Sequence, residues 1–175
     1  MYVILSNTQD RFEFPDLYLN YKYLVKSLII ALPSIQWNIK LHPIEDDSFY
    51  DDILDSNYKN FKILPKSTSL GEALIQSDVA CTLNSTAGLE AMVFQKPVVV
   101  FDIDPMIAES AWWPKLGGGV YVKSAEKMTE FVCKTAADIN FVPELLKKQN
   151  DFLSMCFANQ GRASEAMLDV IKEAL

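Results

Sequence analysis

The chain contains 175 residues, half of them hydrophobic, and carries a formal net charge of −7. This composition is typical of a folded globular protein, and the length predicts a single domain over residues 1–175. Lysine and arginine do not cluster in the sequence, so the electrostatic footprint of a nucleic-acid-binding protein is absent and no nucleic-acid partner is expected.

The three cysteines, Cys81, Cys133 and Cys156, are too widely spaced for a zinc motif or a disulfide framework. We expect all three to be small core residues in a reducing, cytoplasmic compartment. The first residues lack the basic and apolar regions of a signal peptide, and no apolar run of about 18 residues predicts a membrane span.

The first half of the chain alternates strands and helices. Residues 2–6 predict a strand, and apolar residues at helical spacing predict a helix over 17–32 that ends before Pro33. The remaining elements of this half are a strand over 37–41, a short helix within 46–57, a strand over 61–64 and a helix that begins at Ser69, which has capping-box spacing to Glu72.

Residues 78–101 predict a strand, a tight turn, a helix and a second strand. Ser85 or Thr86 can cap the helix, and Pro97 ends it. A helix that starts at the carboxyl end of a buried strand leaves backbone N–H groups free to bind an anion such as a diphosphate. Gly88 lowers helix stability in the first turn, which indicates close approach of a ligand or of backbone. Neither the dinucleotide fingerprint nor the P-loop is present.

Residues 102–119 are expected to form a long loop, followed by a strand over 120–122 and a helix capped by Ser124. In the loop, Trp112 and Trp113 could stack on a base, but an interface role is favoured because paired tryptophans are costly to expose. The glycines at 117–119 permit either a sharp bend or close approach to a ligand. The chain should end in helices over 142–157 and 162–175 that pack outside the sheet.

Six strands alternating with helices predict a doubly wound, Rossmann-like α/β fold with a mainly parallel six-stranded sheet. Ligands of such folds bind at the carboxyl ends of the strands. The polar residues that follow the predicted strands, with their immediate neighbours, are Ser6, Asn7, His42, Lys66, Ser67, Asn84, Ser85, Thr86, Ala87, Gly88, Asp102 and Asp104. Their convergence predicts a nucleotide-type site.

His42 is the only histidine, and it can donate a proton or a hydrogen bond to a leaving phosphate, unless its role is structural. Glu90 can accept hydrogen bonds from ribose or sugar hydroxyls, or simply interact with the helix dipole. Asp102 and Asp104 could hold a divalent ion, but two carboxylates alone do not define a metal site. We expect no metal and no cofactor, because the dipole of the helix that follows the turn at residues 84–86 can stabilise the phosphate charge.

Four segments together resemble the carboxyl-terminal half of GT-B glycosyltransferases: Leu41-His42-Pro43, Ser77-Asp78, residues 84–91 and residues 96–100. They are most similar to capsule polysaccharide synthesis transferases, which have a His-Pro motif and a Ser/Thr-rich phosphate loop. The resemblance spans residues 2–122. It implies that His42, Ser85 and Thr86 contact the phosphates of a nucleotide-activated sugar, and that Glu90 contacts ribose or sugar.

GT-B enzymes have two Rossmann-like halves with the active site between them, and one half fills this chain. The resemblance therefore implies a partner half in a longer chain or a second chain, and little activity without it. It is also consistent with peripheral membrane association of the intact enzyme. Two alternatives remain: half of a nonhydrolysing UDP-N-acetylglucosamine 2-epimerase, whose phosphate turn is more often Ser-Gly-Gly, and a non-catalytic nucleotide-binding module.

Overall fold

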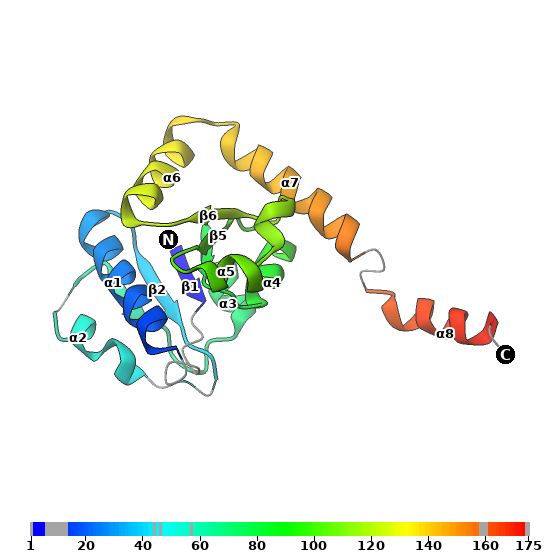
Figure 1. The fold of residues 1–175 in the computed structure, drawn as a ribbon, viewed down its shortest axis with the longest axis horizontal. Helices are drawn as coiled ribbons and strands as arrows, with labels where there is room; N and C mark the ends of the chain where they lie inside the picture. The colour runs from blue at the N-terminus through cyan, green and yellow to red at the C-terminus, as the bar shows by residue number, and fades with distance from the viewer. Residues whose placement is uncertain are drawn as a thin grey trace.

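A computed structural model describes residues 2–5, 14–43, 45, 47–56, 58–157 and 161–173. Within these ranges six strands form a sheet in the order β3-β2-β1-β4-β5-β6, and each neighbouring pair runs parallel. Figure 1 shows the helices arranged around this sheet. The predicted α/β fold with a parallel sheet is confirmed.

The strands lie close to their predicted positions. They are β1 (Tyr2–Leu5), β2 (Trp37–Lys40), β3 (Phe61–Ile63), β4 (Val79–Thr82), β5 (Val98–Phe101) and β6 (Val120–Val122). The helices are α1 (Pro15–Ala31), η2 (Asp47–Tyr50), α2 (Asp51–Leu54), α3 (Leu70–Ile75), α4 (Ala87–Val93), α5 (Pro105–Ser110), η3 (Trp113–Leu116), α6 (Ala125–Ala137), α7 (Phe141–Cys156) and α8 (Ala163–Glu173), where η marks a 3₁₀-helix.

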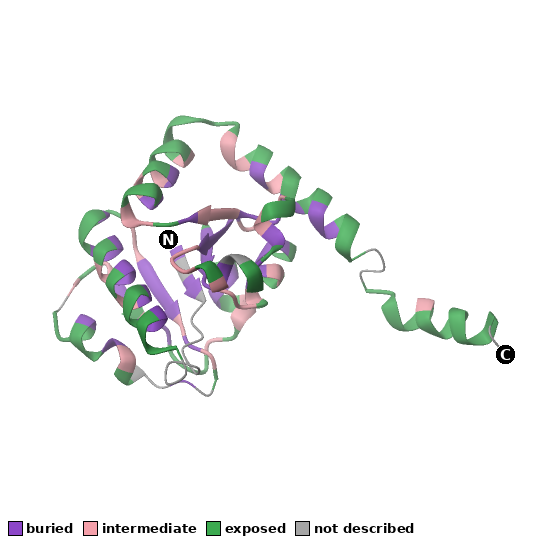
Figure 2. Ribbon diagram, in the orientation of Figure 1, coloured by how far each residue is buried: buried purple, intermediate pink, exposed green. Residues whose placement is uncertain are grey.

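The core lies between the sheet and its covering helices. All four residues of β5 are fully buried, and all four of β4 are buried, as expected for central parallel strands covered on both faces (Figure 2). Helix α1 contacts α6, and α4 contacts α7. None of the described helices has the length and apolar character needed to cross a bilayer.

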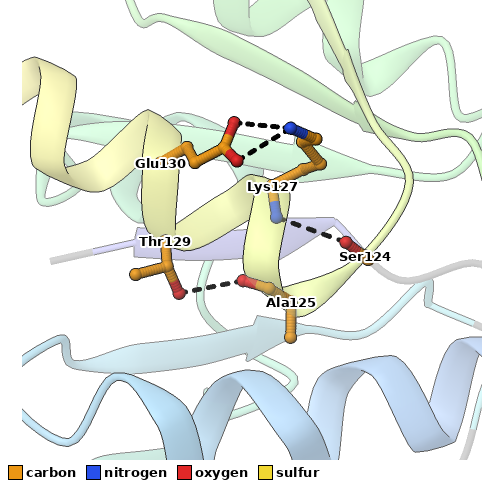
Figure 3. A network of polar contacts seen from close by, with 5 residues as sticks. All are labelled: Ser124, Ala125, Lys127, Thr129 and Glu130. Carbon is orange, nitrogen blue, oxygen red and sulfur yellow. Dashed lines mark hydrogen bonds and ion pairs between the residues drawn. The ribbon is translucent and has the colours of Figure 1, made fainter.

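Helix α6 begins at Ser124, as predicted. The hydroxyl oxygen of Ser124 accepts the N–H of Lys127 at 3.2 Å, and Thr129 donates to the carbonyl oxygen of Ala125 at 2.9 Å (Figure 3). The ammonium group of Lys127 contacts both carboxylate oxygens of Glu130 at 2.7 and 2.8 Å. These local contacts explain why this helix boundary could be predicted from sequence.

The loop predicted over residues 102–119 is wrong, because it contains α5 and η3. Asp104 accepts the N–H of Met106 at 2.9 Å, and Pro105 occupies the first turn of α5. An aspartate cap followed by proline is a helix start, and the helix it begins is short. Trp113 is only 3% exposed and belongs to the core, so its predicted interface role is also wrong.

The glycines before β6 permit a sharp bend, which was one of the two roles predicted for them. Gly117 and Gly119 have φ angles of 92° and 138°, a backbone conformation that residues with a side chain rarely adopt. A Cβ atom on Gly119 would lie 2.7 Å from the carbonyl oxygen of Val98. Glycine at this position therefore lets the chain turn into β6 directly against β5.

Only one cysteine matches the core prediction. Cys81 is buried in β4, and burial raises the pKa of its thiol well above the ordinary value. Cys133 on α6 and Cys156 at the end of α7 are exposed, so the prediction is wrong for them. Both occupy helix positions that face away from the core, a difference that residue type alone does not indicate.

The two carboxyl-terminal helices differ in packing. Helix α7 buries Leu145, Gln149, Phe152 and Leu153, which confirms its predicted position outside the sheet. Helix α8 has no buried residue and extends away from the other helices (Figure 1). The expectation that α8 packs beside the sheet is wrong.

Candidate functional site

A cavity of about 430 Å³ lies at the carboxyl edge of the sheet. The strand order reverses between β1 and β4, and doubly wound folds bind their ligands near such a reversal. Three segments form the wall: the end of β2, the loop from β3 to α3, and the start of α4. The lining residues are Lys40, Leu41, His42, Pro43, Lys66, Ser67, Thr68, Ser69, Leu70, Ser85, Thr86, Ala87 and Glu90.

A tight turn after β2 positions His42. The N–H of His42 donates to a carboxylate oxygen of Glu45 at 2.9 Å, and the N–H of Glu45 donates back to the carbonyl oxygen of His42 at 2.9 Å. Glu45 is only 5% exposed, so its carboxylate anchors the turn from inside the protein. His42 itself is half-buried in the cavity wall.

A capping box shapes the second wall segment, as predicted. The carboxylate of Glu72 accepts the backbone N–H of Ser69 at 2.7 Å and its hydroxyl at 2.8 Å, and Ser69 accepts the N–H of Glu72 at 3.2 Å. The hydrogen bond from the Ser69 backbone contributes most and the bond from its hydroxyl contributes less. Together they hold the pKa of the Glu72 carboxyl below its ordinary value of 4.5. The box fixes the start of α3 and thereby the loop that carries Lys66 and Ser67.

The backbone donors at the start of α4 are largely used within the protein. Ser85 donates its N–H to the Thr82 hydroxyl at 3.1 Å, and Ala87 donates to the Ser85 hydroxyl at 3.2 Å. The N–H groups of Gly88 and Leu89 donate to the carbonyl oxygens of Ser85 and Thr86, each at 2.9 Å. The predicted row of free donors is therefore wrong, because a tight local turn closes on itself. Ser85 does stabilise the helix start, as predicted.

Gly88 faces the sheet. A Cβ atom there would lie 3.2 Å from Thr82 Cγ2 and 3.5 Å from the Trp113 ring. The small residue thus permits close packing of α4 on the core, which explains its presence without a ligand. Gly88 and the half-buried Asn84 do not line the cavity.

The cavity brings together seven residues that the sequence predicts at the site, namely His42, Lys66, Ser67, Ser85, Thr86, Ala87 and Glu90. Two others, Ser6 and Asn7, lie outside the described residues.

Lys40, which the sequence motifs did not indicate, also lines the cavity. Residues two apart in a strand share a face. Because the sequence predicts a strand over 37–41 that leads directly into His42, this spacing could have indicated that Lys40 and His42 lie on the same side.

A second cavity of about 490 Å³ adjoins the first along α4. Thr86 and Glu90 line both cavities. The remaining wall of the second cavity is mostly apolar and consists of Leu89, Val93, Leu153, Phe157 and Gly161. Glu90 therefore lies at the boundary between a polar compartment and an apolar one.

Asp102 and Asp104 have local partners. Asp104 caps α5, and Asp102 pairs with Lys123 at 3.3 Å. In the described part of the chain, no three His, Cys, Asp or Glu side chains are grouped so that they could hold a metal ion.

No protein-family model and no curated protein matches the sequence. Solved structures do match. The C-terminal CMP-Kdo binding domain of WaaA from Acinetobacter baumannii has a TM-score of 0.58 and 15% identity, covering 87% of this chain and 88% of that one. Spinosyn rhamnosyltransferase SpnG has a TM-score of 0.57 and 13% identity, covering 87% of this chain and 41% of that one.

These neighbours define the fold class. The chain shares the parallel α/β fold of the C-terminal CMP-Kdo binding domain of WaaA and of part of the rhamnosyltransferase SpnG. It covers less than half of the matched rhamnosyltransferase chain. At these sequence identities the likeness concerns the fold, and the chemistry of the site must be argued from its own residues.

Proposed function

We propose that this chain is the donor-binding domain of a glycosyltransferase and that it holds a nucleotide sugar in the 430 Å³ cavity. One observation carries the proposal: His42, from the turn after β2, and Ser85, Thr86 and Glu90, from the start of α4, line one cavity at the ligand-binding edge of the sheet. Hydroxyl, imidazole and carboxylate groups together suit a ligand that has both phosphate and sugar hydroxyls.

Each residue has a proposed role. His42 and the Ser85 hydroxyl donate hydrogen bonds to the phosphate, and Thr86 supports the same group. Glu90 accepts hydrogen bonds from ribose or sugar hydroxyls at the boundary between the two cavities. During transfer, an acceptor displaces the nucleotide at the anomeric carbon, and His42 and Ser85 stabilise the charge that develops on the leaving phosphate.

The pathway proposed is bacterial surface or capsular polysaccharide synthesis, in the cytoplasm. The His-Pro step at His42 and Pro43 and the Ser85-Thr86 turn support it, since these motifs resemble the capsule transferases. The likeness to a CMP-Kdo binding domain makes a cytidine nucleotide one of the donors to test. The acceptor-binding half is proposed to reside in a longer chain or in a partner.

The first prediction tests the phosphate contacts. His42→Ala and Ser85→Ala should each weaken nucleotide binding by about 1–3 kcal/mol, as for a lost hydrogen bond to a charged group. The losses should be non-additive in the double variant, because both residues act on one phosphate. Calorimetry with CMP, CDP, UMP and UDP measures both effects, and binding should be unchanged by EDTA because no metal is proposed.

Ser124→Ala is the matched control. Both serines accept a backbone N–H at a helix start at 3.2 Å, but Ser124 lies on α6 and does not line the cavity. Each substitution should cost roughly 1 kcal/mol of stability, and only Ser85→Ala should weaken binding. Wild-type affinity in both His42→Ala and Ser85→Ala would place the nucleotide elsewhere and leave His42 as a structural residue.

A further inference from the structure

The charge that attracts an anion into the 430 Å³ cavity needs a source other than the start of α4. The backbone N–H groups of Ala87, Gly88 and Leu89 already donate within the turn. Helix α4 is also only seven residues long. The whole chain carries a net charge of −7, so its overall field repels anions.

Two lysines line the cavity on the side formed by β2 and β3. Lys40 is the last residue of β2, and Lys66 lies in the loop after β3, the strand that pairs directly with β2. The N–H of Leu64, the residue after β3, donates to the carbonyl oxygen of Ile39 at 2.8 Å, so Lys40 and Lys66 follow this bond by one and two residues at the same edge of the sheet. Neither lysine forms an ion pair with a carboxylate of the described residues.

Lys40 is held in the cavity wall. It is half-buried, and its Nζ donates to the carbonyl oxygen of Leu41 at 2.7 Å. An ammonium group has three N–H donors, so this single bond orients the group and does not exhaust it. A partly desolvated ammonium group without a carboxylate partner interacts favourably with an incoming anion.

The charges of the cavity wall are separated. The lysines lie on the β2–β3 side together with His42, whereas the carboxylate of Glu90 lies on α4. Strand β1 lies between β2 and β4, the strand that leads into α4. The β2–β3 side therefore suits a phosphate, and the α4 side suits sugar hydroxyls.

We propose that Lys40 and Lys66 hold the phosphate of the nucleotide and supply the charge for its binding, while His42 and Ser85 orient it. The assignment rests on the function proposed above. It predicts that phosphate-bearing ligands depend on the two lysines, whereas a nucleoside, which has no phosphate, does not.

The test compares Lys40→Met, Lys66→Met and the double variant with the wild type. The probes are CMP, UMP, cytidine, uridine and pyrophosphate, at about 50 mM and 200 mM NaCl. Each substitution should weaken binding of nucleotide and pyrophosphate by roughly tenfold, as for a lost charge-assisted hydrogen bond. Each should also reduce the salt dependence of binding, and leave nucleoside binding within about twofold.

Two controls separate charge from structure. Lys62→Met removes an exposed lysine on β3 that does not line the cavity, and should bind as the wild type does. Lys40→Arg and Lys66→Arg keep the positive charge and should recover most of the affinity. Melting curves identify any variant that fails to fold. At such a position, the arginine variant then tests whether the positive charge supports binding.

The outcomes distinguish the two proposals. Wild-type affinity for nucleotide and pyrophosphate in both methionine variants would overturn the lysine assignment and leave the nucleotide site in place. Lysine-dependent binding of pyrophosphate without binding of any nucleotide would support the lysines and overturn the donor-binding function. Absence of binding by every probe to the wild type would overturn both.

Discussion

At the residue scale, the side chain of Gln149 holds α7 against the sheet. Its Oε1 accepts the N–H of Val98 at 2.9 Å, and its Nε2 donates to the carbonyl oxygen of Lys96 at 2.8 Å. The ladder between β5 and β6 begins at Val99 and Val120, so these backbone groups precede it. The side-chain amide of Gln149 thus satisfies two backbone groups that a neighbouring strand would otherwise satisfy, although Gln149 lies far from Lys96 and Val98 in the sequence.

Gln149→Leu should destabilise the protein by about 2–4 kcal/mol, since each buried backbone group left without a partner costs roughly 1–3 kcal/mol. Leucine keeps much of the side-chain volume, so the loss reports the two hydrogen bonds. Urea denaturation measures it. The neighbouring Asn150 pairs with Gln95 at the surface, and Asn150→Ala should change stability by only about 0.5 kcal/mol. Equal effects of the two substitutions would contradict this role of Gln149.

The cavity residues show the same dependence on distant neighbours. Ser85 and His42 were identifiable because each follows a predicted strand, at positions where doubly wound folds bind ligands. By contrast, the sequence could not predict that the backbone N–H groups at the start of α4 already donate hydrogen bonds. These bonds depend on the Thr82 hydroxyl and on the path of the turn. Gly88 was noticed for its effect on helix stability, but its neighbours come from the core.

At the scale of elements, α7 and α8 have opposite relations to the rest of the protein. Helix α7 buries four side chains, whereas α8 buries none. The large apolar residues of α8 are all exposed, namely Met167, Leu168, Val170 and Ile171. Under the function proposed above, we expect this helix to contact the acceptor-binding half.

Removal of residues 162–175 should leave the melting temperature within about 1 °C of the full chain, because no buried contact is lost. A chain ending at residue 148 is the control, and it should melt at a much lower temperature because it lacks Gln149, Phe152 and Leu153. Calorimetric melting of the three chains gives the comparison. A marked decrease after removal of 162–175 alone would show that α8 packs on the domain in solution.

At the scale of the whole molecule, the cavity is bordered by one domain only. A GT-B active site lies between two halves, and we propose that this chain supplies the donor half. The purified chain should therefore bind nucleotide weakly and transfer little sugar. Incubation with CMP- and UDP-activated sugars, followed by product analysis, tests this expectation.

Addition of an acceptor-binding half should restore transfer with wild-type chain and much less with His42→Ala. Robust transfer by the purified chain alone would contradict the need for a second half. Epimerisation of UDP-N-acetylglucosamine would instead favour the epimerase alternative. Nucleotide binding that never supports turnover with any partner would favour a non-catalytic module.

The sequence by itself determined the alternation of strands and helices, the helix starts at Ser69 and Ser124, and the α/β class. These features depend on periodicity and on contacts a few residues apart, which the order of residues records directly. Helix α5 was not predicted, although the Asp104 cap and the Pro105 that start this helix are also local features. The sequence also identified His42, Ser85, Thr86 and Glu90 as candidates, because strand ends can be located from apolar runs.

Only the tertiary structure decided which candidates share a cavity and which serve the core. The strand order places the end of β2 near the start of α4, and thereby joins His42 to Ser85 in one wall. The same arrangement adds Lys40, turns Gly88 toward the sheet and brings Gln149 to the edge of β5. The physical reason is that packing brings together residues that are far apart along the chain, and local patterns carry no record of that packing.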